Sequence, residues 1–244
     1  VDSRAFGLPQ RRQRVFLLAS REWKPEELLF QEDVGDSETI DHRGKACGFY
    51  WTEGVRGLGW AVDAVPTLKG GSTIGIPSPP AIWFPGGLIA TPDIRDAERM
   101  QGFPTDWTLP AATSGNRNAR WKLVGNAVTV NTAEWIGSCL IKTPKIPSLL
   151  PLPFDTFRSW PKAAFGAPGK GRFEISVSMF PRNRKRVPLE QFLKYSPAPL
   201  SHRAVSGFTA RLQSGSLNYP DEFMEDLIKH REKMAPSTTA IPAA

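Results

Sequence analysis

The chain has 244 residues, 40% of them hydrophobic and 23% charged, which is the ordinary balance of a globular protein with a real core. No apolar run approaches the length of a membrane span. The two cysteines, Cys47 and Cys139, form no metal-ligand pattern and are too few for a disulfide scaffold, so we expect a reducing, cytoplasmic setting. A net charge of +7 suits a polyanionic partner, although many basic proteins bind no nucleic acid.

Residues 6–20 (FGLPQRRQRVFLLAS) combine a basic turn with an apolar run. The run over 14–19 is short, apolar and rich in β-forming residues, so we predict a buried strand. Gln10, Arg12 and Arg14 lie at its start, where side chains can emerge into a cleft, and a planar guanidinium suits a phosphate oxygen or a base carbonyl. The alternative is a solvated basic turn.

Residues 21–90 have a weaker, irregular pattern with many glycines and prolines. It favours a single helical turn over 24–30, a β-prone segment at 49–51 and a short strand at 82–84. Cations here could reach base edges in a DNA groove, although any one of them more often faces water. The candidates are Arg43, Lys45, Arg56 and Lys69.

Residues 65–73 (VPTLKGGST) form a second candidate contact. A Gly-Gly pair lets the backbone approach a ligand closely, and the hydroxyls of Ser72 and Thr73 could bind a phosphate. A strand end followed by a turn explains the same residues equally well.

A short capped helix is predicted over residues 91–102. Thr91 is a suitable N-cap, Pro92 fits the first helical position, and Gly102 ends the helix. It carries Arg95 and Arg99, which could simply pair with acids on the same helix. Further along, we predict a helix over 118–124 that Gly-Asn at 125–126 interrupts, and a second helix over 128–140.

The remainder of the chain reads as an appendage after a proline-rich linker. We predict a half-buried strand at 174–180, a basic cluster at 182–186, and amphipathic helices over 200–212 and 220–234 that begin at Ser201 and Pro220.

Three of these blocks together resemble the DNA (cytosine-5)-methyltransferases. They are Gln-x-Arg-x-Arg at residues 10–14, Arg-x-x-x-Arg-x-x-Gly-Phe-Pro at 95–104 and Gly-Asn-Ala-Val at 125–128, in the family's order. Each block is weak alone, but three in order at family-like spacing are a strong signal. The resemblance covers residues 6–140 closely and the remainder more loosely.

The resemblance implies transfer of a methyl group from S-adenosyl-L-methionine to carbon 5 of a cytosine that is flipped out of double-stranded DNA, as in restriction-modification systems. It implies an α/β fold: the C-terminal piece of a Rossmann-like methyltransferase, a small irregular, β-rich target recognition domain and a helical C-terminal appendage. The expected divisions are residues 1–20 (end of the catalytic domain), 21–90 (target recognition), 91–143 (return to the catalytic domain), 144–153 (linker), 154–235 (appendage) and 236–244 (disordered tail).

Residue roles follow from the same resemblance. Arg12 and Arg14 would hold the extruded base and its phosphate, with Gln10 supporting them. Asn126, with the backbone of Ala127, would complete the S-adenosylmethionine pocket. Of the two helix arginines, Arg99 would organise the recognition region, and we group Arg95 with it as structural support.

The chain departs from the family in its chemistry. The family's nucleophile stands in a Pro-Cys motif, whereas Cys47 follows alanine and Cys139 follows serine. The Glu-Asn-Val and Phe-x-Gly-x-Gly blocks do not occur in the sequence. We therefore expect a fragment or one piece of a split protein that transfers no methyl group alone.

The expected partner is the N-terminal catalytic half of the same or a split enzyme, in the nucleoid-associated cytoplasm of a prokaryote or in a phage. The alternatives are a stand-alone DNA-binding protein and a non-catalytic subunit of a split restriction-modification methyltransferase.

Overall fold

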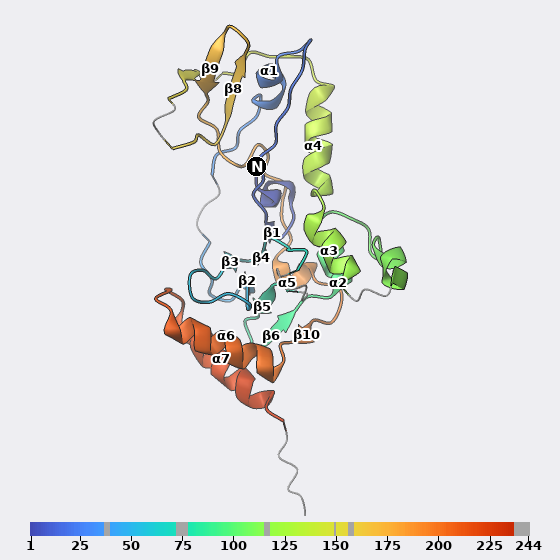
Figure 1. The fold of residues 1–244 in the computed structure, drawn as a ribbon, viewed down its shortest axis with the longest axis vertical. Coiled ribbons are helices and arrows are strands. Elements are labelled where there is room, and N and C mark those ends of the chain that lie inside the picture. The colour runs from blue at the N-terminus through green and yellow to red at the C-terminus, as the bar shows by residue number, and fades with distance from the viewer. Residues whose placement is uncertain (37–39, 72–77, 115–117, 149, 156–158, 237–244) are drawn as a thin grey trace, which may run out of the picture. The chain divides into compact units, whose positions relative to one another are not determined.

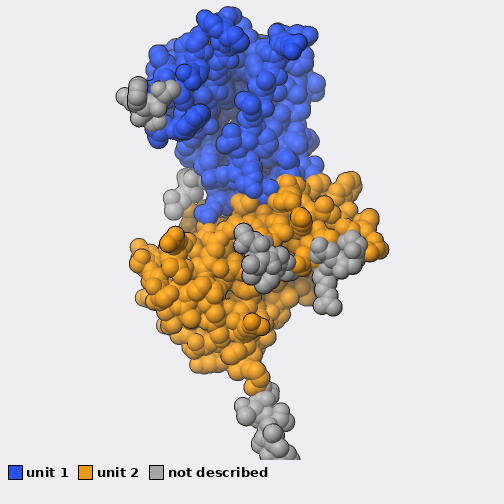
Figure 2. Space-filling model, viewed as in Figure 1, with its two compact units in different colours: residues 1–39, 128–187 blue, residues 40–127, 188–244 orange. Residues whose placement is uncertain are grey.

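The structure is a computed structural model that describes residues 1–36, 40–71, 78–114, 118–148, 150–155 and 159–236. Within these ranges the chain is a mixed α/β protein (Figure 1). It divides into two compact units (Figure 2), each formed from two separate stretches of chain. Unit 1 comprises residues 1–39 and 128–187, and unit 2 comprises residues 40–127 and 188–244. None of the described helices is long and apolar enough to cross a membrane.

Unit 2 is built on a five-stranded antiparallel sheet with the strand order β10-β6-β5-β2-β3. Its strands are β2 (Cys47–Phe49), β3 (Ala61–Val62), β5 (Ala81–Trp83), β6 (Ile89–Thr91) and β10 (Ala198–Pro199). In the central strand, Ile82 lies opposite Gly48 on one side and Ala90 on the other. Successive residues of a strand point to opposite faces, so the apolar residues of β5 serve two separate cores.

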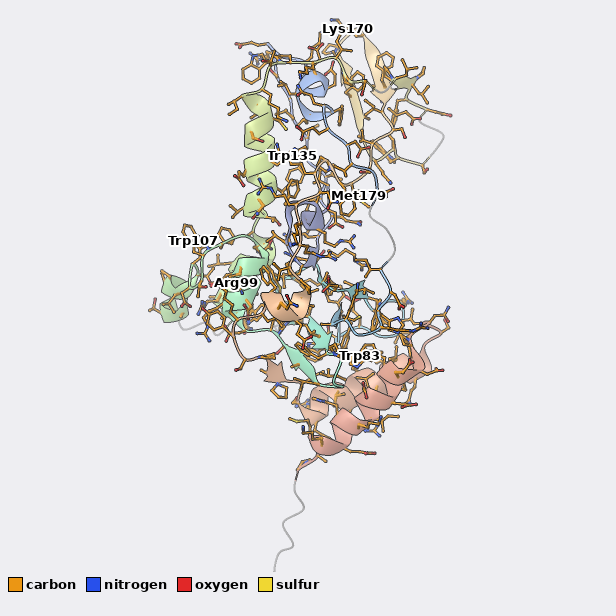
Figure 3. All side chains as sticks on the ribbon, turned by 180° about the vertical axis from the view of Figure 1, so that it is seen from behind. Trp83, Arg99, Trp107, Trp135, Lys170 and Met179 are labelled. Carbon is orange, nitrogen blue, oxygen red and sulfur yellow. The ribbon has the colours of Figure 1, made fainter. Side chains whose placement is uncertain are left out.

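Helices cover both faces of this sheet. One face carries Phe49, Trp83 and Ile89 and packs against α6 (His202–Ser214) and α7 (Asp221–Lys233). The other face carries Ile82 and Ala90. It packs against α2 (Ile94–Met100), α3 (Ala119–Asn126) and α5 (Leu189–Phe192), together with residues of β4 (Val65–Pro66). Trp83, labelled in Figure 3, also donates its indole N–H to Asp226 of α7 over 2.8 Å.

Unit 1 contains a three-stranded antiparallel sheet of order β7-β9-β8 and a small separate core. The core packs Phe6 against Trp135, with ring centroids 5.8 Å apart, and adds Cys139 and Phe180. The elements of this unit are a 3₁₀ helix η1 (Ser3–Phe6), β1 (Gln10–Arg11), α1 (Pro25–Leu29), α4 (Val130–Leu140), β7 (Leu152–Pro153), β8 (Ala164–Ala167) and β9 (Gly171–Glu174).

Several sequence predictions are confirmed. Helices α1, α4, α6 and α7 lie where the periodicity placed them, and Ser201 caps α6 by accepting the amide N–H of Ala204. The mixed α/β class is also observed. The two named sheets are antiparallel, whereas a Rossmann-like fold rests on a mostly parallel sheet, so that part of the fold, like the domain divisions, stays a prediction.

Other predictions are wrong. Residues 14–19 form no buried strand, because Val15 and Leu17 are 98% and 95% exposed and the segment has no regular structure. The strand expected at 174–180 does not form, because strand β9 (Gly171–Glu174) and its ladder with β8 end at the first residue of that range.

Two helix boundaries are also corrected. Helix α2 begins after Asp93, whose carboxylate accepts the Arg95 amide over 2.8 Å, because Thr91 is taken by strand β6. Gly125 does not interrupt α3, which continues to Asn126. The predicted tail at 236–244 lies outside the described residues except for Pro236.

Candidate functional site

In unit 2 the structure brings the Gly-Asn block into contact with the Lys-Gly-Gly segment. A Cβ atom added to Gly125 would lie 2.2 Å from the backbone nitrogen of Gly70 and 2.3 Å from the carbonyl carbon of Lys69. Any side chain there would collide with backbone, so glycine is required. A Cβ atom on Gly70 would in turn lie 3.1 Å from Oδ1 of Asn126. Two blocks more than fifty residues apart thus form one corner, which we call the Gly70–Gly125 corner (residues 69–70 and 125–126).

The loop that follows α2 is held by a buried carboxylate. Glu98 is fully buried and accepts the amide N–H groups of Asp106 and Thr108 over 2.7 and 2.8 Å, as well as the Thr108 hydroxyl. Arg120 of α3 donates to the same carboxylate over 3.0 Å and also to Asp106 over 3.0 Å. A buried charge is stable only when paired and hydrogen-bonded, so this network fixes the Gly-Phe-Pro loop between α2 and α3.

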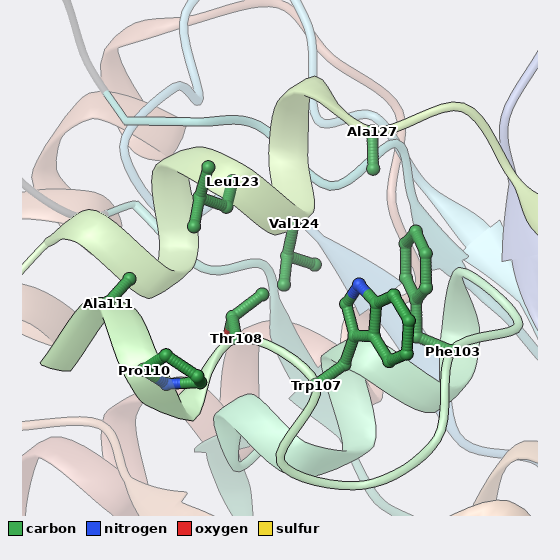
Figure 4. Close-up of a pocket in the computed structure, with 8 residues that line it drawn as sticks. All are labelled: Phe103, Trp107, Thr108, Pro110, Ala111, Leu123, Val124 and Ala127. Carbon is green, nitrogen blue, oxygen red and sulfur yellow. The ribbon is translucent and has the colours of Figure 1, made fainter.

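The fixed loop forms the wall of a pocket of about 390 Å³ (Figure 4). Phe103 and Trp107 stack with their ring centroids 5.6 Å apart and their planes 13° apart, and Trp107 remains 60% exposed. The pocket is lined by Phe103, Trp107, Thr108, Pro110, Ala111, Leu123, Val124 and Ala127. It is almost entirely apolar, because the Thr108 hydroxyl is already bonded to Glu98. It can therefore accept an aromatic or aliphatic group but offers few polar atoms to orient one.

The two arginines of α2 pair with acids close to them in the sequence, and each also contacts an aromatic residue of the stretch 192–195. Arg99 donates to Asp96 over 2.5 Å and to the Phe192 carbonyl over 2.6 Å, with its guanidinium 4.3 Å from the Phe192 ring centroid. Asp96, fully buried, accepts the amides of Lys194 and Tyr195.

Arg95 pairs with Asp93 over 2.8 Å and lies 3.8 Å from the ring centroid of Tyr195. Hydrogen bonding from Arg95 lowers the pKa of the Asp93 carboxyl. Support of the recognition region by the two arginines stays a prediction; their observed contacts hold the chain after α5 against α2.

The DNA-contact candidates are exposed side chains. Arg43, Lys45, Arg56 and Lys69 all lie on the surface of unit 2. Lys69 pairs with Glu53 and lies 3.6 Å from the ring centroid of Tyr50, while Arg43 lies 3.8 Å from Asp41. Ser72 and Thr73 lie outside the described residues.

The Gln-x-Arg-x-Arg block belongs to unit 1. Gln10 is fully buried and Arg12 is almost fully buried, so the two do not emerge as the sequence suggested. Arg14 is exposed, and its amide is held by the Val1 carbonyl over 3.0 Å. Arg14 is thus the exposed arginine of the block, and its guanidinium donates to the Gln13 carbonyl over 2.7 Å. Unit 1 holds this block and unit 2 holds Asn126 and Ala127.

Neither cysteine is placed to act as a nucleophile. Cys47 is completely buried in the sheet, and burial raises the pKa of its thiol to about 12. Cys139 is buried in the core of unit 1, and burial raises its pKa as well. A thiolate is the reactive form, so both thiols are inert near neutral pH. Within the described ranges no group of histidine, cysteine and acidic residues could hold a metal ion.

Sequence reasoning missed the residues that organise this part of unit 2. The sequence favours pairing of the acids of α2 with arginines of the same helix, whereas the cation that pairs with Glu98 is Arg120, 22 residues away. The sequence gives a weak indication of the pocket residues Trp107 and Leu123, because these large apolar residues lie close to the blocks at 95–104 and 125–128.

Comparison with known proteins finds a similarity that extends along the chain. No family model and no solved structure matches it significantly. The chain is 43% identical, over 96% of its length, to the type II methyltransferase M2.BsuMI of Bacillus subtilis (strain 168). It spans 62% of the length of that protein.

Proposed function

We propose that this chain is the DNA-recognising portion of a type II DNA methyltransferase. The observation that carries the proposal is the 43% identity to M2.BsuMI, which extends over 96% of the chain. The net charge of +7 and the exposed cations of unit 2 suit a polyanionic substrate. The name of this relative, a type II methyltransferase, does not specify the base or the atom that is methylated.

The finer proposal is methylation at carbon 5 of cytosine. It is supported by the three blocks at residues 10–14, 95–104 and 125–128, which resemble the cytosine-5 enzymes. Residues 21–90 would then form the target recognition region, where exposed cations such as Arg43, Lys45 and Arg56 would contact base edges or the phosphate backbone. Arg14 would contact a DNA phosphate, because its guanidinium is exposed, while the buried Gln10 and Arg12 would support the block from within.

S-adenosyl-L-methionine is the proposed cofactor, and it would supply the electrophilic methyl group. The residues present fit one edge of such a site. Asn126 has an exposed amide at the end of α3, and Ala127 lines the apolar pocket beside it. The backbone of Gly70 approaches Asn126 closely, since a Cβ atom on Gly70 would lie 3.1 Å from Oδ1 of Asn126.

The nucleophile is proposed to come from another polypeptide segment. Cytosine-5 methylation needs a thiolate that adds to the ring, and both thiols of this chain are buried with raised pKa values. This observation also favours the second candidate, a non-catalytic subunit or DNA-binding protein derived from such an enzyme. The two readings share DNA binding and differ in whether methyl transfer can be restored.

The test uses the chain, the part of M2.BsuMI outside the alignment, and both together. Transfer of a labelled methyl group from S-adenosylmethionine to DNA is measured, and nuclease digestion followed by mass spectrometry identifies the methylated base. We expect no transfer by the chain alone and 5-methylcytosine from the mixture. DNA binding by the chain without restored transfer supports the second candidate, and methyl transfer by the chain alone contradicts the proposed division of the site.

A further inference from the structure

The proposed function gives no role to the basic cluster at residues 182–186 (Arg-Asn-Arg-Lys-Arg), in which four of the five side chains are cations. The structure exposes its middle three residues, Asn183, Arg184 and Lys185. Arg182 and Arg186 are half-buried at its two ends. Neighbouring like charges repel one another, so an anion that binds to such a cluster is attracted by several cations at once.

The basic cluster and the Gln-x-Arg-x-Arg block belong to the same compact unit, unit 1. Both are hydrogen-bonded to the first residues of the chain. The amide of Ser3 donates to the Arg12 carbonyl over 3.0 Å, and the amide of Arg184 donates to the Ala5 carbonyl over 3.1 Å. Two basic segments that are far apart in the sequence are thus attached to one short stretch of backbone.

The backbone of the cluster is packed rather than free. A Cβ atom added to Gly7 would lie 3.2 Å from the carbonyl oxygen of Lys185 and 3.5 Å from Cβ of Arg184. Just before the cluster, the carbonyl of Met179, labelled in Figure 3, accepts the amide of Asp2 over 3.0 Å. A segment that is held in this way loses less conformational entropy on binding than a flexible basic tail does.

The exposed cations of the cluster are not committed to strong ion pairs. Arg184 lies 3.7 Å from the carboxylate of Glu134, and both side chains are largely exposed, so the pair contributes about 0–1 kcal/mol. Lys185 forms no ion pair with any residue that the structure describes. Arg182, in contrast, donates to Glu32 over 3.2 Å. The guanidinium of Arg184 and the ammonium of Lys185 can therefore exchange weak contacts for a stronger anion.

We propose that residues 183–185 contact the phosphate backbone of duplex DNA, beside the phosphate contact proposed for Arg14. The proposal rests on the proposed function, which makes DNA the substrate. It adds a contact outside residues 21–90 and outside the Gln-x-Arg-x-Arg block. Arginine, lysine and asparagine side chains all donate to phosphate oxygens, and such contacts position a protein on the duplex without reading its sequence. Residues 183–185 thus orient unit 1 on DNA of any sequence.

The experiment measures binding of the full chain to two duplexes of unrelated sequence by gel shift at several salt concentrations. Arg184→Ala/Lys185→Ala should lower the slope of log K against log salt by about 2, because each phosphate contact contributes about 0.9. Affinity for both duplexes should fall at least about 10-fold in about 0.1 M salt. Arg184→Lys/Lys185→Arg keeps both charges and should keep the slope.

The matched control is Lys229→Ala/Lys233→Ala, which removes the same charge from two exposed residues of α7. Lys229 lies near the carboxylates of Glu225 and Asp226, an unfavourable setting for a phosphate, so the slope should not change. All three variants should unfold at the temperature of the unaltered chain, because the replaced side chains are exposed.

Three results would overturn the phosphate contact. They are an unchanged slope for Arg184→Ala/Lys185→Ala, an equal loss of slope in the control, and a loss of affinity confined to one duplex. Failure of the unaltered chain to bind either duplex would overturn it as well.

Methyl transfer to DNA, measured with the chain mixed with the part of M2.BsuMI outside the alignment, separates this contact from the proposed function. A lowered slope without methyl transfer supports the contact and counts against the proposed function. Methyl transfer with an unchanged slope overturns the contact and supports the proposed function.

Discussion

The guanidinium of Arg120 lies 3.0 Å from Oε1 of Glu98, a carboxylate that is completely buried. The pair joins α3 to α2 and, through the amides of Asp106 and Thr108, fixes the loop that carries Trp107. Arg120 therefore helps to hold the loop of the block at residues 95–104, although it is not part of that block.

Replacing Glu98 should destabilise unit 2. Glu98→Ala leaves Arg120 and two loop amides without their carboxylate, and breaking a buried pair in this way costs about 3–5 kcal/mol. Urea unfolding measures the loss. The control, Glu225→Ala, removes an exposed partner of Lys229 and should change the free energy of unfolding by less than about 0.5 kcal/mol. A loss below about 1 kcal/mol for Glu98→Ala would show that the network contributes little.

Replacement by alanine should have opposite effects on stability at two helical glycines, Gly125 and Gly137. Gly125→Ala drives a methyl group into the backbone of residues 69–70, so we expect a loss of about 1–3 kcal/mol or more. Gly137→Ala in α4 meets nothing within 4 Å and should raise the stability by up to about 1 kcal/mol, because alanine favours the helix. Thermal unfolding monitored by circular dichroism measures both. Equal effects would contradict the close approach of the two segments.

The cysteines should be unreactive in the folded chain. The pKa of Cys47 is raised to about 12 by burial and that of Cys139 is also raised, so the thiolate fraction near pH 8 is negligible. Titration with a thiol reagent at pH 8 should label neither thiol in minutes, and both after denaturation. Rapid labelling of one thiol in the native chain would show that its burial is incomplete.

The raised pKa of Cys47 also makes the free energy of unfolding depend on pH. A thiol whose folded pKa is higher than its unfolded pKa stabilises the fold fully below the unfolded value, near 9. That contribution is lost as the pH rises from about 9 toward about 12. Cys47→Ala should therefore unfold with a weaker dependence on pH in this window than the unaltered chain, as measured by urea unfolding at pH 8, 9 and 10. An identical dependence would contradict the shift.

Arg56 should contribute to DNA affinity through charge. If it contacts a phosphate, Arg56→Ala should weaken binding to all sequences similarly and reduce the slope of log K against log salt by about 1. Gel-shift titrations at several salt concentrations measure the slope. Lys24→Ala, which removes an exposed cation paired with Glu27 in unit 1, is the control and should leave the slope unchanged. A sequence-selective loss at Arg56 would instead indicate contact with a base.

The sequence by itself determined the local features of this protein. Helices α4, α6 and α7 follow from apolar spacing and start signals, because a helix in a globular protein is selected largely by its own buried face and its caps. The three family-like blocks were also visible as sequence, since each is a short run of residues.

Only the tertiary structure determined which residues those helices and blocks contact. The sequence gives no signal that Gly125 meets Gly70, that Arg120 neutralises Glu98, or that Arg99 holds Phe192, because each contact joins residues brought together by the packing of helices on a sheet. The exposed segment at 15–19 shows the same limit from the other side: its composition predicted a strand, but a strand forms only where a neighbour satisfies its backbone hydrogen bonds.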